Sequence, residues 1–186
     1  MSNVFKNFPI LHTPHLVLRQ LDSSDKDAIY KLYSDPTVSS ARERLPFMVP
    51  EESSIMIKQI LDNYRATTRI RWAIEHRDTQ KLIGTIGIRS SVPISSHGDA
   101  YMNFELAKEY RGQGLMKEAL KVVVDFSMDV VQLHKLYADF FSDNSAIPHL
   151  LEKFGFSKDF KEMRYSAAVN SDVEYTVYSK QHDSIH

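Results

Sequence analysis

The sequence predicts a domain of the α/β or α+β class built on one mixed β-sheet. The first observation is the order of its patterned segments, β-α-α-β-β-β-α-β-α-β-β, in which strand-like alternation is interspersed with helical periodicity. The second is composition: 42% of the 186 residues are hydrophobic and 25% are charged, which is ordinary for a globular chain. This length suits a single hydrophobic core, so we expect one domain over residues 1–186.

The first strand and the first helix are predicted at residues 16–21 and 22–33. Apolar and polar residues alternate around Arg19, as in a strand with one buried face. The run Asp22-Ser23-Ser24-Asp25 supplies side chains that cap a helix. Asp35-Pro36 ends this helix, because a proline disfavours helical geometry in the residue before it.

A second helix and a β-hairpin follow. The helix begins at Pro50-Glu51-Glu52-Ser53, and its expected apolar stripe consists of Ile55, Ile57, Ile60 and Leu61. Two strands lie near residues 71–75 and 82–89. The polar link at 77–80 suits a hairpin loop between them.

The second half of the chain repeats this mixture of strands and helices. After a turn-rich stretch at 90–99, the expected elements are a strand at 100–107, a long helix from 114 to about 133, a strand at 135–140, a short helix at 146–154 that ends at Gly155, and two hairpin strands at 162–167 and 173–178.

Composition excludes several kinds of site. A formal net charge of -1 gives no basic field for nucleic acid, and we expect no nucleic-acid partner. The chain has no cysteine, which rules out disulfides, cysteine nucleophiles and thiolate metal ligands. The eight histidines show no paired metal spacing, so we expect no metal. Neither a signal peptide nor a long apolar run is evident, and we therefore expect a cytoplasmic protein without a membrane partner.

The sharpest local signal is the segment 109–116, Glu-Tyr-Arg-Gly-Gln-Gly-Leu-Met. Gly112 and Gly114 lie directly between a predicted strand and a long helix. Glycine permits positive φ and a close approach of the backbone to a ligand. The free N–H groups at the start of the helix would suit a pyrophosphate. An ordinary strand-to-helix turn is an equally good explanation of these residues alone, since short glycine motifs are common.

At this point the sequence resembles the GNAT acetyltransferase superfamily, in particular its RimJ/RimL branch of ribosomal-protein N-terminal acetyltransferases. The family turn, Arg/Gln-x-x-Gly-x-Gly/Ala, is matched by Arg111-x-x-Gly114-x-Met116, with Met116 in place of the usual small residue. The segment 143–156 is similar to the branch's Asn-x-x-Ser…Glu-Lys-x-Gly-Phe helix, and 13–19 is similar to its opening strand. The matches run in order over a core of about residues 9–180.

The resemblance implies the GNAT fold and acetyl-CoA as cosubstrate. That fold has a mixed, mostly antiparallel sheet of about six or seven strands, flanked by helices, with one splayed strand pair that binds the coenzyme. In such proteins the turn holds the pyrophosphate, the splayed strand pairs with the pantetheine arm, and an N–H near Leu106 polarises the thioester carbonyl. The implied coenzyme-binding residues are Leu106, Lys108, Arg111, Gly112, Gln113, Gly114, Leu115, Met116, Lys117 and Asn144.

Two of these residues have alternative roles. Lys117 could pair with a phosphate or be solvated. Asn144 could contact the coenzyme arm, cap a helix, or do both. The backbone groups of Lys108 are expected to pair with the pantetheine together with those of Leu106.

Glu105 is the candidate general base. An amine is mostly protonated at neutral pH, and a carboxylate near the thioester could take its proton directly or through water. The alternative is a surface glutamate on a strand. A general acid is missing, because Ile147 stands where the branch commonly has serine and Leu151 where other superfamily members have tyrosine.

The expected function is N-acetyl transfer from acetyl-CoA to a primary amine by direct attack. The amine could be a ribosomal or other protein N-terminus, or a small molecule. The alternative is a GNAT-fold protein that binds a coenzyme or a partner and transfers little. The branch is often dimeric, so the resemblance allows a homodimer.

Overall fold

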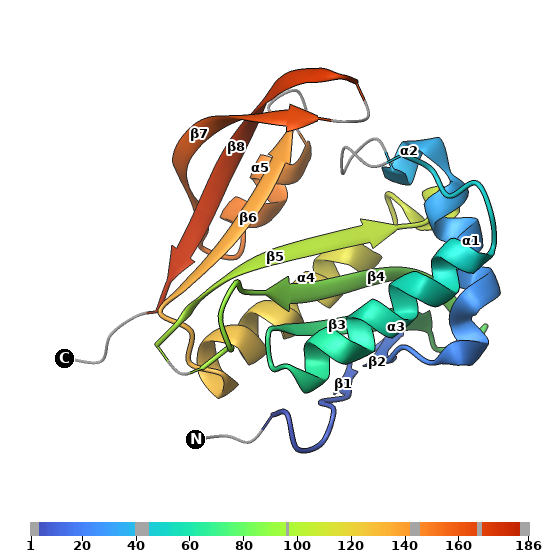
Figure 1. The fold of residues 1–186 in the computed structure, drawn as a ribbon. Helices are drawn as coiled ribbons and strands as arrows, with labels where there is room; N and C mark the ends of the chain where they lie inside the picture. Colours follow the sequence, from blue (N-terminus) through green and yellow to red (C-terminus); the bar gives the residue numbers. More distant parts are fainter. Residues whose placement is uncertain (1–3, 40–44, 96, 142–145, 167–168, 183–186) are drawn as a thin grey trace.

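The computed structural model describes residues 4–39, 45–95, 97–141, 146–166 and 169–182 (Figure 1). An eight-stranded sheet runs through it in the order β1-β2-β3-β4-β5-β6-β8-β7. The strands are β1 Leu11–His12, β2 Leu16–Gln20, β3 Arg69–His76, β4 Lys81–Arg89, β5 Asp99–Leu106, β6 Lys135–Phe141, β7 Ser157–Ser166 and β8 Ser171–Gln181. Every neighbouring pair is antiparallel except β5 and β6, which confirms the mixed, mostly antiparallel sheet. The eighth strand is the two-residue β1, which is too short to show a pattern in sequence.

Helices cover both faces of the sheet. They are α1 Lys26–Ser34, α2 Pro36–Ser39, α3 Glu51–Arg65, α4 Leu115–Asp125 and α5 Ala146–Glu152, with 3-10 turns at Ser23–Asp25 and Lys108–Tyr110 and a π-helix at Phe126–Val130. Figure 1 shows α3 in front of β3 and β4, with α4 on the opposite face and α5 behind β6. Among the described residues, no helix is long and apolar enough to span a membrane.

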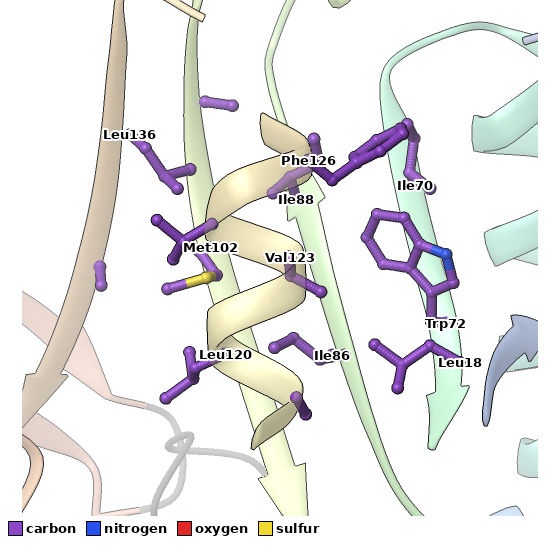
Figure 2. Packing of buried hydrophobic residues seen from close by; sticks show 14 of the residues in the cluster. Leu18, Ile70, Trp72, Ile86, Ile88, Met102, Leu120, Val123, Phe126 and Leu136 are labelled. Atoms are coloured by element: carbon purple, nitrogen blue, oxygen red, sulfur yellow. The ribbon is translucent and has the colours of Figure 1, made fainter. Parts of the chain in front are cut away.

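The larger hydrophobic core lies between α4 and the sheet. Figure 2 shows Leu120 and Val123 of α4, with Phe126 just beyond it, facing the buried side chains of β2 to β6. Trp72 meets Phe126 edge to face, with ring centroids 5.6 Å apart. Each fully buried side chain of this kind contributes about 1.5–3 kcal/mol to folding. This packing holds the start of α4 against the end of β5.

A second core lies under α1, α2 and α3 on the other face. Within α3 the buried residues are Ser53, Met56, Ile57 and Ile60, which follow the i, i+3, i+4, i+7 spacing of one helical face. The predicted stripe was wrong at Ile55, which is 56% exposed. A residue two positions from a buried one points to the opposite side of the helix, so Ile55 faces solvent.

The long helix predicted through residue 133 was also too long. Regular α-helix ends at Asp125, and a π-helix continues to Val130. Ser127 Oγ donates to Val123 O at 2.7 Å, and Val131 N–H reaches back five residues to Phe126 O. Side-chain competition for a helix carbonyl of this kind bends or widens a helix, and it ends α4 early.

Candidate functional site

A cavity of about 440 Å³ opens where the end of β5, the turn after it and three helices meet. The lining comes from α2, β5, the turn, the start of α4 and the start of α5. The structure brings most of the predicted site residues to this cavity: Glu105, Leu106, Arg111, Gly112, Gly114, Leu115, Met116 and Lys117. Lys108 and Gln113 lie in the same turn without lining the cavity, and Asn144 lies outside the described residues.

The strands β5 and β6 separate beside this cavity. Their parallel pairing runs only from Asp99–Lys135 to Met102–Ala138. Beyond this point β5 continues to Leu106 beside β4, while β6 continues to Phe141 beside β8. The last part of β5 therefore has a backbone edge that none of the described strands pairs with, which is the splay that the resemblance implied.

The hydrogen bonds around the end of β5 show which of its backbone groups face the splay. Leu106 O accepts a hydrogen bond from Arg111 Nε at 3.0 Å, whereas Ala107 N–H donates to Ile83 O of β4 at 2.8 Å. The N–H and C=O of one strand residue point to the same edge, and successive residues alternate. The N–H groups of Leu106 and Phe104 therefore point away from β4 and toward the splay. Lys108 lies past the strand, in the exposed 3-10 turn, where its carbonyl accepts Arg111 N–H.

The glycine turn has the geometry that a pyrophosphate requires. Gly112 and Gly114 have φ of 75° and 80°, and no heavy atom lies within 4 Å of a Cβ built on either. The first hydrogen bond of α4 is Glu118 N–H to Gly114 O, so the N–H groups of the first turn have no partner inside the helix. Gln113 Nε2 braces the turn by donating to Glu109 O at 2.9 Å. An anion could approach this backbone without displacing any side chain, so the residues present fit the phosphates of a coenzyme.

Glu105 is buried at the cavity rather than exposed on a strand, with 8% of its surface accessible. Its Oε2 accepts hydrogen bonds from Arg71 Nη2, Tyr33 Oη at 3.1 Å and Thr85 Oγ1 at 2.9 Å. The Arg71 guanidinium also forms a salt bridge with it. The alternative of a surface glutamate therefore does not hold, and its role as base stays a prediction.

Burial and neighbouring charges shift the pKa of Arg71 in opposite directions. Burial lowers the pKa of its guanidinium, but the charge of Glu105, followed by Tyr33, raises it, and the net pKa lies above its usual range. Arg71 is thus a permanent buried cation. For Tyr33, whose charged form is the anion, burial raises the pKa. Its hydroxyl therefore stays protonated and able to donate.

Sequence reasoning missed Arg71, Tyr33, Thr85 and Asn103, which complete this network. The alternation of Arg69 and Arg71 with Ile70 and Trp72 signals a strand with one polar face. Nothing in that pattern shows that the polar face is buried against Glu105, because this depends on strand order.

The two apolar residues at the expected acid positions lie in different surroundings. Ile147 of α5 lines the cavity, whereas Leu151 is fully buried in the larger core. Neither side chain can donate a proton. Among the described residues, no group of three or more His, Cys, Asp or Glu is placed to hold a metal ion.

Comparison with known proteins agrees with this geometry. A family model described as "Acetyltransferase (GNAT) domain" matches residues 15–157. The uncharacterized N-acetyltransferase YoaA of Bacillus subtilis is 33% identical over 172 residues, covering 92% of this chain and 96% of the relative.

Solved structures share the fold. The ribosomal-protein-S5-alanine acetyltransferase of Vibrio fischeri superposes with a TM-score of 0.82 at 20% identity, covering 95% of this chain and 98% of that one. The spermidine N-acetyltransferase of Vibrio cholerae, in complex with CoA and spermine, superposes with a TM-score of 0.77 at 20% identity, covering 91% and 97%.

Proposed function

Because this chain belongs to the GNAT acetyltransferase family, we propose that it transfers the acetyl group of acetyl-CoA to a primary amine by direct attack. It is an acetyl-CoA-dependent N-acetyltransferase, and it resembles the RimJ/RimL branch of the family. The observation that carries the proposal is the single cavity that joins the glycine turn to the unpaired edge of β5.

The turn and the strand edge have separate tasks in this proposal. The N–H groups of Gly112 to Lys117 and the positive end of α4 hold the pyrophosphate. The N–H groups of Phe104 and Leu106 bind the pantetheine arm and the thioester carbonyl, as an added strand would. Lys117, exposed at the mouth of the cavity, pairs with a phosphate. When bound, acetyl-CoA supplies an activated acetyl group on its thioester sulfur.

Glu105 is proposed to take the proton of the attacking amine. The carboxylate lies at the cavity, and Arg71, Tyr33 and Thr85 hold one of its oxygens in place. Such fixed geometry favours proton transfer, because the base need not reorganise when the amine arrives. The proton moves from the amine nitrogen to the carboxylate, directly or through one water.

The departing thiolate has no protein acid in this proposal. Ile147 faces the cavity from α5 at the position where the branch commonly has serine. A thiolate is a fair leaving group in water, so its proton can come from solvent. The apolar side chain then serves to exclude water from part of the cavity.

The acceptor is proposed to be a primary amine of either of two classes. Among similar proteins, one is named a ribosomal protein uS5-alanine N-acetyltransferase and another a spermidine N(1)-acetyltransferase. These names motivate a protein N-terminus and a polyamine as test acceptors. The cytoplasmic location and the homodimer stay predictions.

The test combines binding and turnover. Calorimetric titration should show acetyl-CoA binding, and a thiol-release assay should show CoA formation with at least one amine from a panel of peptides, amino-acid amides and polyamines. Mass spectrometry of the product should show one added acetyl group on nitrogen. Tight binding with no thiol release above the amine-free rate for any acceptor would replace this proposal with its alternative, a coenzyme-binding protein that transfers little.

A further inference from the structure

Asn103 lies where the two strands begin to separate. Met102 is the last residue of β5 that pairs with β6, and Asn103 is the next. Since side chains alternate along a strand, Asn103 lies on the same face as Glu105 and opposite to Phe104. Its side chain is half-buried beside the splay.

The amide of Asn103 has only one possible orientation. Arg71 Nη1 donates to its Oδ1 at 2.5 Å. A guanidinium carries donors and no acceptor, so the oxygen of the amide must face Arg71 and the NH₂ group must face away from it. The other terminal nitrogen of Arg71, Nη2, donates to the side-chain oxygens of Tyr33, Thr85 and Glu105.

Gly87 is the reason that Arg71 can reach Asn103. Arg71, Gly87 and Asn103 lie in one row across β3, β4 and β5. A Cβ at Gly87 would lie 2.6 Å from Ile70 O and 3.0 Å from Arg71 Cα. With no side chain on the middle strand, the guanidinium crosses it and contacts both Asn103 and Glu105 on β5.

The NH₂ group of Asn103 finds no acceptor in the part of the chain that the structure describes, and the residue is partly buried. An oriented donor beside the splay favours a ligand oxygen, because a ligand that covers the amide without accepting its hydrogen bond would lose free energy.

We propose that Asn103 is a specificity-determining residue that donates a hydrogen bond to a carbonyl oxygen of the acceptor, and that Arg71 is the positioning residue that orients it. This inference rests on the proposed function and narrows its substrate class. It favours α-amino acyl groups, as at a peptide N-terminus, over polyamines, which carry no oxygen.

The spacing of the two residues fits such an acceptor. Asn103 and Glu105 are two residues apart on one strand face, which is about 6.6 Å. In an α-amino acyl group the nitrogen and the carbonyl oxygen are about 3 Å apart. A hydrogen bond of about 3 Å from Asn103 to that oxygen leaves the nitrogen beside Glu105.

The test compares two acceptors that differ at one carbon. Alaninamide and 1,2-diaminopropane share a skeleton, but only the first has a carbonyl next to the amine-bearing carbon. In Asn103→Asp the carboxylate still accepts from Arg71 but cannot donate to the acceptor. We expect kcat/KM for alaninamide to fall about tenfold, as for one lost hydrogen bond, while kcat/KM for 1,2-diaminopropane is kept or rises. Asn63→Asp, the same substitution in α3 away from the cavity, should leave the ratio of the two values unchanged.

Arg71 is tested through the same ratio. Arg71→Lys keeps the positive charge but loses the guanidinium group that contacts Asn103 and Glu105 together. In the wild-type background it should lower the ratio of kcat/KM for alaninamide to that for 1,2-diaminopropane. In an Asn103→Ala background it should leave that ratio unchanged. A role in folding alone would lower both activities and leave the ratio unchanged in both backgrounds.

The outcomes separate the two proposals. An active enzyme whose ratio moves less than twofold in both Asn103→Asp and Asn103→Ala, or whose wild type prefers the diamine, overturns the role of Asn103 and leaves the acetyltransferase proposal intact. Acetyl-CoA binding with no transfer to any amine overturns the proposed function, and this inference with it.

Discussion

Arg71 and Glu105, which are 34 residues apart in the sequence, form a buried ion pair at the inner end of the candidate site, with only 4% and 6% of their side chains exposed. The pair lies on neighbouring rows of β3 and β5, and the glycine between Arg71 and Asn103 permits the contact. It links the stability of the domain to the geometry of the cavity.

The first prediction concerns the free energy of unfolding. Arg71→Leu should destabilise the domain by about 3–5 kcal/mol, because it leaves the Glu105 carboxylate buried without its cation. The double variant Arg71→Leu/Glu105→Leu should recover part of that loss. Urea unfolding at pH 7 measures both. Asp62→Asn, which breaks exposed pairs with Lys58 and Arg65 in α3, should have a much smaller effect on stability. A double variant less stable than Arg71→Leu would show that the buried charge is not the cause.

The second prediction concerns turnover. Glu105→Gln keeps the shape of the side chain and can still accept from Arg71, but it cannot take a proton. We expect kcat to fall roughly 10²-fold, with acetyl-CoA affinity unchanged and the acidic limb of the pH–rate profile lost. Steady-state thiol release and calorimetry measure these. A rate and profile like those of the wild type would make Glu105 a structural residue.

The third prediction concerns charge at the glycine turn. Gly114 has φ of 80°, and its Cβ position is open, so asparagine and aspartate should fit equally well at a similar cost in backbone strain. Aspartate also places a negative charge where a pyrophosphate is proposed to bind. We expect Gly114→Asp to weaken acetyl-CoA binding at least tenfold more than Gly114→Asn. Equal dissociation constants for the two variants would place the phosphates elsewhere.

The fourth prediction concerns the leaving group. Ile147→Ser places a hydroxyl at the cavity, where it can stabilise charge that forms on the sulfur only in the transition state, so the maximal rate should rise without tighter acetyl-CoA binding. Ile147→Ala removes the same apolar bulk without a hydroxyl and serves as the control. Both variants should lose about 1–3 kcal/mol of stability, which thermal melting checks first. If the serine variant is no faster than the alanine variant, thiolate departure needs no protein acid.

The fifth prediction concerns acid stability. Glu118 of α4 accepts hydrogen bonds from the His15 backbone N–H at 2.8 Å and lies 3.0 Å from His15 Nδ1. Burial raises the pKa of Glu118, but hydrogen bonds from Thr13 and His15 outweigh it and hold the pKa below its usual 4.5. A carboxyl with a lowered folded pKa stabilises the fold above its unfolded pKa, and that contribution is lost as pH falls through the folded pKa.

Glu118→Gln should therefore be less stable than the wild type by about 1 kcal/mol at pH 7. The difference should shrink as pH falls below about 4.5, where the wild-type carboxyl also becomes neutral. Urea unfolding across pH 3–7 measures it, with the exposed Asp125→Asn as control. A difference that stays constant down to pH 3 would assign the effect to shape rather than charge.

Features that depend only on residues close together in the sequence could be predicted. The order of helices and strands followed from apolar periodicity, and the glycine turn before α4 followed from the positive φ that Gly112 and Gly114 allow. Errors arose where a local pattern was ambiguous. Ile55 has the right chemistry for a buried stripe but the wrong angular position, and the helix after Asp125 changes its hydrogen bonding because of Ser127.

The sequence by itself determined the fold class, the strand-to-helix turn and the family, because these depend on residue types at short, fixed spacings. Only the tertiary structure decided that Glu105 is buried against Arg71, that Gly87 lets Arg71 reach across to β5, and that the amide oxygen of Asn103 faces Arg71. The physical reason is register. Contacts between β3, β4 and β5 depend on which residues lie opposite one another, and a shift of one residue would move every side chain to the other face of the sheet.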